Sequence, residues 1–301
     1  RFVVSYSFVF RSPLVIFLLA ALLSVAFAES RGLAFYQFLR LLALVAMAFV
    51  VGRIARDKRI FKIILGTIAV FAVTQSLIGI AQFANQGAIG FSWLGESPIS
   101  PTDGASSKIL VGACPAMAEL FCGGSRVLRA YGLFPHPNVL GAFLVLGLLS
   151  LVYFYIKLDR KLYETLFDPK QKIRENFRRF MRSRSLYIRI VLAAAIFVVL
   201  LGLTLTFSRS AWLAAGVSLL FLFVLLILGR SASIRSIARL LFLLVASGYA
   251  LVAMLGPFIL PRATFSRAEP AVEYRLRYNE MAIDIIRKNP FGVGMGNQVL
   301  Y

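Results

Sequence analysis

Seven long apolar segments constrain this chain more than any other feature of its sequence. A helix rises about 1.5 Å per residue and the hydrocarbon core of a bilayer is about 30 Å thick, so about 20 mostly apolar residues span it. Lipid offers no partner to unpaired backbone groups, and none of the seven segments alternates as a strand does. The sequence therefore predicts an all-α, polytopic transmembrane helix bundle, with spans near residues 10–28, 33–52, 60–82, 139–156, 188–206, 211–229 and 240–260.

The composition excludes a soluble globular protein. Hydrophobic residues make up 59% of the 301 positions, and charged residues only 15%. The net charge of +20 would suit a nucleic-acid partner in a soluble chain, but here the basic residues lie between the apolar segments. Because basic loops stay in the cytoplasm, we expect the first residues to be cytoplasmic and the basic loop 157–188 to lie against anionic lipid headgroups, with no nucleic-acid partner.

The polar stretches that carry information are expected on the extracytoplasmic side. The loop 83–137 contains Cys114 and Cys122, which can form a disulfide in an oxidising compartment or remain two separate buried thiols. We divide the chain into a transmembrane bundle, 1–260, and the start of a large extracytoplasmic loop, 261–301. That loop is expected to contain an amphipathic helix over 270–288, lying on the bundle or on the outer leaflet. Because the chain lacks an initial methionine and stops in polar sequence, we expect it to be part of a longer protein.

A first candidate site is Arg209, which lies in the very short connection between the spans 188–206 and 211–229. Ser208 or Ser210 can cap the following helix, whose positive dipole end then lies beside the guanidinium. The alternative is an arginine that only anchors a helical hairpin at the lipid surface. Trp212, close behind it, is expected to be an interfacial anchor.

A second candidate site is the segment Arg129–Asn138 before the span 139–156. Pro135 and Pro137 are expected to prevent a helix there, and Asn138 to cap a helix that begins at Val139. An arginine beside a helix start is a receptor for phosphate oxygens, although a purely structural proline turn is the alternative. His136, the one histidine of the chain, either shapes this turn or transfers protons.

A third candidate site combines Arg275 and Arg277 with the glycine-rich run that follows the amphipathic helix. The spacing of glycines in this run allows tight turns or close approach of the backbone to another group. An exposed face of ion pairs, such as Glu273 with Arg277, is the alternative for the charges. The run consists of Pro290, Gly292, Gly294, Gly296 and the residues between them.

Taken in order, the three motifs resemble the O-antigen ligase and O-antigen polymerase superfamily over about residues 120–301. The resemblance implies a bacterial inner-membrane, multi-pass enzyme that moves glycan from an undecaprenyl diphosphate carrier to a lipid, glycan or protein acceptor. It implies an inverting mechanism that needs neither metal nor cofactor. Arg129, Arg209, Arg275 and Arg277 are then the expected ligands of the diphosphate, since fixed guanidinium groups stabilise a phosphate leaving group.

The base that accepts the acceptor's proton is not identified by the sequence. The resemblance places a histidine after the glycine-rich run, beyond Tyr301, and otherwise His136, Glu273 or no residue of this chain serves. A transporter or flippase of a lipid-linked anionic glycan is the alternative function, and a scaffold subunit is a third. Acceptor identity, total number of spans and oligomeric state are not set by these motifs.

Overall fold

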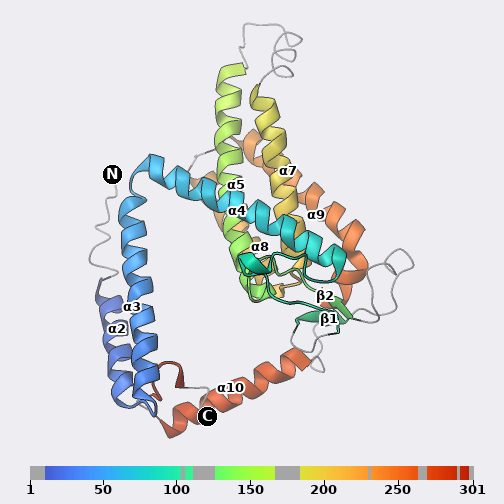
Figure 1. The fold of residues 1–301 in the computed structure, drawn as a ribbon. Coiled ribbons are helices and arrows are strands. Elements are labelled where there is room, and N and C mark those ends of the chain that lie inside the picture. Colours follow the sequence, from blue (N-terminus) through green and yellow to red (C-terminus); the bar gives the residue numbers. More distant parts are fainter. Residues whose placement is uncertain are drawn as a thin grey trace. The chain divides into compact units, whose positions relative to one another are not determined.

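The computed structural model describes residues 11–102, 106–110, 126–166, 184–229, 232–263, 270–289 and 292–297. Helices dominate these residues (Figure 1). The helices are α2 (Arg11–Ala26), α3 (Arg31–Ile54), α4 (Lys58–Asn85), α5 (Pro137–Leu166), α7 (Arg184–Leu205), α8 (Arg209–Leu228), α9 (Ile234–Ala263) and α10 (Pro270–Lys288).

Six helices in the described part of the chain are long and apolar enough to cross a membrane: α3, α4, α5, α7, α8 and α9. The seventh expected span corresponds to α2, whose apolar part, Pro13–Ala26, is shorter than the other six. Large apolar side chains are exposed along these helices, as expected for surfaces that face lipid. The prediction of an all-α, polytopic membrane bundle is confirmed.

The chain divides into two compact units, one of residues 62–264 and one of residues 1–61 and 265–301. In the first unit α5 is the central helix, because 61% of its most apolar window is buried. It packs against α7, α8 and α9. A stripe with helical spacing forms the centre of this contact, and each of its residues is fully buried: Leu140, Leu144, Leu148 and Val152.

Small residues let the helices of this unit approach closely. A Cβ added to Gly141 of α5 would lie 2.8 Å from the Cβ of Ala211 in α8. One added to Gly202 of α7 would lie 2.6 Å from the Oγ of Ser76 in α4. Membrane helices lack a strong hydrophobic drive to associate, so close backbone packing of this kind is a main source of their cohesion.

Two boundaries differ from the predicted ones. The helix α5 begins at Pro137, where no backbone N–H is needed, and it continues to Leu166, so the predicted basic loop 157–188 starts and ends as helix. A helix requires only backbone pairing, so it can extend beyond the apolar residues that hydropathy detects. The expected loop 83–137 also contains a 3-10 turn, Ser92–Leu94, and a short antiparallel pair of strands.

The strand pair joins β1 (Lys108–Leu110) to β2 (Arg126–Leu128), with Ile109 opposite Val127. We predicted no strand in this chain. Strands of three residues are too short for an alternating pattern to be recognised in the sequence. Cys114 and Cys122 lie outside the described residues, so their predicted pairing stays a prediction.

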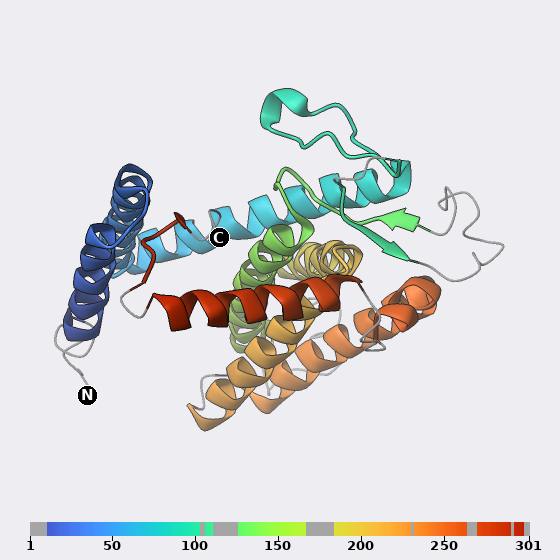
Figure 2. The same ribbon diagram turned by 90° about the horizontal axis from the view of Figure 1, so that it is seen from below.

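The other unit contains α2, α3 and α10. The helices α2 and α3 lie side by side, joined by a short turn (Figures 1 and 2). The helix α10 covers the residues expected for the amphipathic helix, and its large apolar side chains are exposed.

Candidate functional site

Arg129 lies at the centre of a hydrogen-bond network at the start of α5. Its side chain is only 6% exposed. The Nε donates to the carbonyl oxygen of Thr206 at 2.6 Å, one terminal nitrogen to Ser107 Oγ at 2.9 Å, and the other to Asn138 Oδ1 at 2.7 Å. Arg129 thus joins the strand region, the first turn of α5 and the connection between α7 and α8.

The connection between α7 and α8 is held in a strained conformation. Phe207 has a φ of +46°, which is rare for a bulky residue and costs on the order of 1–3 kcal/mol. Its ring is buried and packs against the rings of Phe83 and Trp212. The side chain of Arg129 donates a hydrogen bond to the carbonyl oxygen of Thr206, the residue before Phe207. Such strain persists only where surrounding contacts fix it, and it is concentrated at functional sites.

Arg209 is the first residue of α8, immediately after this turn. Ser208 is the N-cap, and its Oγ accepts a hydrogen bond from the backbone N–H of Ala211 at 3.4 Å. The Oγ atoms of Ser208 and Ser210 are also 3.2 Å apart. The helix cap is therefore in place, and the positive dipole end of α8 lies at the partly exposed Arg209.

An apolar cavity of about 300 Å³ opens beside the same turn. Trp212 lines it, and the indole Nε1 donates to the carbonyl oxygen of Leu203 at 3.1 Å. The sequence indicated an interfacial anchor at this position; the structure also places it in the cavity wall. The other lining residues come from α7, α8 and α9, among them Leu200, Ala215, Leu244, Gly248 and Leu251.

The segment Pro135–Asn138 differs from its prediction. Pro137 does not prevent the helix but begins it, and Asn138 is not the cap, because its Oδ1 is bonded to Arg129. The capping acceptor is His136, whose Nδ1 accepts the backbone N–H of Asn138 at 3.1 Å. Pairing of Asn138 with a distant arginine cannot be read from local sequence, which explains the error.

The environment of His136 favours its neutral form. Loss of hydration, and to a smaller extent the positive charge of Arg129, lower the pKa of the imidazole below its ordinary value. The neutral ring is also the form that can accept at Nδ1. This geometry gives His136 a structural partner, and its use as a base stays a prediction.

Three glutamines on and just after α4 were missed by the sequence analysis. The Oε1 of Gln82 accepts the backbone N–H groups of Tyr131 and Gly132, at 3.2 and 2.8 Å. Gln75 and Gln86 accept in the same way from Leu133 and Leu128. Gln75 and Gln82, seven residues apart in an apolar helix, were the available signal, and Gln86 follows the end of that helix. The three glutamines hold the segment that carries Arg129.

Glu96 is a second missed residue. It is 6% exposed, and its carboxylate accepts from Gln82 Nε2 and the backbone N–H of Ile89, both at 2.8 Å, and from that of Phe91 at 2.6 Å. Burial raises the pKa of this carboxyl, but the hydrogen bonds together outweigh it, so the pKa is lowered. Glu96 therefore fixes the loop after α4 as an ionised acceptor.

The third motif lies in the other compact unit. Gly292, Gly294 and Gly296 all have φ near +85°, a region that favours glycine. Gly296 lies against the side chain of Gln37 in α3, and Asn297 donates to the carbonyl oxygen of Ser30 at 3.3 Å. Arg277 is exposed on α10. Pro290 and the side chains of Arg275 and Glu273 are outside the described part.

Comparison with known protein families finds a match in the C-terminal part of the chain. Residues 193–301 match the O-antigen ligase family. The matched stretch begins in α7 and includes Arg209 and the glycine-rich run, whereas Arg129–Asn138 precedes it. No curated protein and no solved structure matches the chain. The resemblance to this family inferred from the motifs is confirmed over residues 193–301.

The match supports a function of the O-antigen ligase type in general. Because six helices among the described residues are long and apolar enough to cross a membrane, the chain is a multi-pass membrane protein.

Proposed function

We propose that the turn between α7 and α8 binds the diphosphate of an undecaprenyl-linked glycan, and that the full protein transfers this glycan to a lipid, glycan or protein acceptor. The observation that carries the proposal is the juxtaposition, within one unit, of a charged helix start and an apolar cavity. Arg209 and the dipole of α8 suit the diphosphate. The cavity lined by Trp212 and Gly248 suits the first prenyl groups of the carrier.

In the proposed reaction an acceptor hydroxyl oxygen attacks the anomeric carbon of the sugar. The bond between that carbon and the diphosphate oxygen breaks, and the lipid diphosphate leaves with the electron pair. The acceptor's proton passes to a base. Arg209 stabilises the negative charge on the leaving group, and attack from the opposite face inverts the anomeric configuration.

Arg129 takes a different part from the one the sequence suggested. Three of its donors already bond protein acceptors, and one of these is the carbonyl of Thr206 in the strained turn. We therefore propose that Arg129 is a positioning residue that fixes the turn and sets the place of Arg209. Arg275 and Arg277, which the sequence also suggested as diphosphate ligands, stay a prediction from the sequence.

A transfer assay with the full-length protein and a lipid-linked glycan in detergent tests the role of Arg209. Replacing Arg209 with Ala is expected to lower the rate about a hundredfold or more, because a donor to developing charge is lost. Lys at this position restores part of the rate, since the charge remains without the planar fork. Arg235, exposed at the start of α9, is the control: Arg235→Gln leaves the rate unchanged.

The cavity is tested separately with two glycine variants. A Cβ at Gly248 meets no atom within 4 Å, so Gly248→Leu fills the cavity without a backbone clash and is expected to weaken donor binding. The matched control for Gly248→Leu is Gly216→Leu, because Gly216 is exposed on the neighbouring helix and a Cβ there also meets no atom within 4 Å. Equal donor KM values for the two variants would overturn the prenyl site. Transport of the donor without transfer would favour the flippase alternative.

A further inference from the structure

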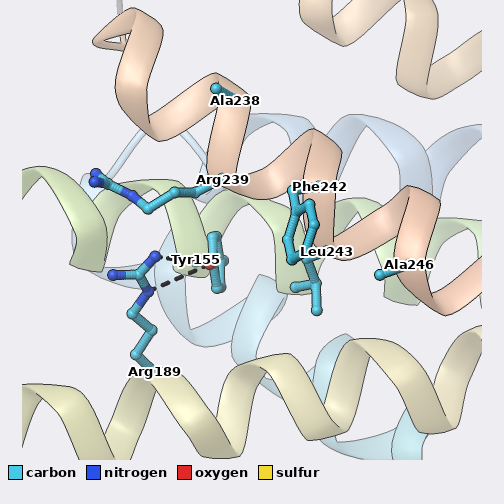
Figure 3. Close-up of a pocket in the computed structure, with 7 residues that line it drawn as sticks. All are labelled: Tyr155, Arg189, Ala238, Arg239, Phe242, Leu243 and Ala246. Atoms are coloured by element: carbon cyan, nitrogen blue, oxygen red, sulfur yellow. Dashed lines mark hydrogen bonds between the residues drawn. The ribbon is translucent and has the colours of Figure 1, made fainter.

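A second cavity, of about 400 Å³, lies between α5, α7 and α9 (Figure 3). Among the described residues that line it, the charged ones are Arg189 of α7 and Arg239 of α9. The rest are Tyr155 of α5 and apolar residues of α9. Two guanidinium groups in an otherwise apolar wall are the pattern of a site for an anion that carries an apolar group.

Tyr155 fixes the position of Arg189. The Nε and one terminal nitrogen of Arg189 donate to the hydroxyl oxygen of Tyr155, at 3.3 and 3.1 Å. Tyr155 itself is only 4% exposed. An arginine held by a buried partner loses less side-chain entropy on binding a ligand, so the site is already organised for an anion.

The charged and apolar parts of this cavity are separated. Figure 3 shows the side chains of Arg189 and Arg239 extending toward one end of the pocket, while Phe242 and Leu243 line the other. This order matches an amphiphile with its phosphate at the arginines and its hydrocarbon along α9.

The cavity is far from the proposed diphosphate site. Tyr155 follows Pro137 by 18 residues in one continuous helix, which corresponds to about 27 Å of helix length, close to the thickness of a bilayer core. The network of Arg129 surrounds the first turn of α5, so the two sites lie toward opposite ends of the bundle. The basic residues that follow Tyr155 in sequence predict that its end is cytoplasmic.

We propose that Arg189 and Arg239 bind the phosphodiester of an anionic phospholipid from the leaflet at this end, with an acyl chain against Phe242 and Leu243. The bilayer supplies this ligand at high local concentration, and the charge of the site is complementary to it. The bound lipid would join α7 to α9 through their arginines. This inference does not depend on the proposed function.

Native mass spectrometry of the whole protein, extracted from vesicles of equal amounts of phosphatidylglycerol and phosphatidylcholine, tests the site. The wild type is expected to retain phosphatidylglycerol in preference to phosphatidylcholine. Arg189→Gln and Arg239→Gln are each expected to lower the retained phosphatidylglycerol about fivefold, the effect of one basic residue near an anionic surface. Arg235→Gln, on the same helix as Arg239 but outside the cavity, keeps the wild-type value.

A variant that keeps both charges separates binding from folding. Ala246→Phe fills the cavity wall and is expected to reduce retention, whereas Ala253→Phe, exposed on the same helix outside the cavity, does not. Equal retention in all variants would overturn the site. Displacement of the lipid by inorganic phosphate or pyrophosphate would instead identify a free anion as the occupant and overturn the phospholipid assignment.

Discussion

The segment around Arg129 and the region around Arg277 contain the same sequence elements, an arginine with glycine and proline nearby, but they use them differently. Arg129 is buried, and its donors bond three parts of one unit. Arg277 is exposed on α10 in the other unit. Arginines that look alike in a motif therefore divide into one that is buried and joins parts of the fold and one that is exposed on a helix surface. Variants in matched pairs test this difference.

The largest effect is expected at the arginines themselves. Arg129→Ala leaves the buried carbonyl of Thr206 and the partly buried side chains of Ser107 and Asn138 without their donor, so we expect a loss of about 3 kcal/mol of stability. Arg277→Ala is expected to leave stability unchanged. Thermal unfolding of both variants in the same detergent measures this, and equal melting temperatures would remove the distinction.

Glycines with positive φ provide the second comparison. Gly132 has a φ of +59°, and a Cβ there would lie 2.6 Å from Gln75 Oε1, so Gly132→Ala is expected to cost about 2–3 kcal/mol from strain and displacement of the glutamine. Gly292 has a φ of +86° but open space around it, so Gly292→Ala should cost only about 1 kcal/mol. The difference between the two unfolding midpoints is the measurement, and the reverse order would show that close packing matters less than backbone strain.

The smallest effect is a pH dependence at the start of α5. The pKa of His136 is lowered in the folded protein, so the unfolded chain binds the proton more tightly. The contribution of neutral His136 to the free energy of unfolding is complete above the imidazole's pKa in the unfolded chain, about 6.5, and is lost as the pH falls below that value. Melting temperature should decline modestly between pH 7.5 and 5.5. His136→Asn, which retains a capping acceptor but does not titrate, should reduce this decline.

Local sequence was sufficient for some parts of the site and misleading for others. The cap at Ser208 was among the two predicted, because it depends only on residues within one helical turn. Asn138 was assigned the wrong role, since its partner is nine residues away across a turn. Gln75 and Gln82 were visible as polar residues in an apolar span, but their role depends on contacts with a segment about 50 positions later.

The sequence alone determined the membrane-spanning helical class and the positions of most helices, because length and hydropathy decide whether a segment can lie in lipid. It also indicated the O-antigen ligase family through ordered motifs. Only the tertiary structure decided which arginines are buried and bonded to protein acceptors, which glycine faces a neighbouring helix, and where cavities remain. Those properties depend on contacts between distant segments, and no local pattern encodes them.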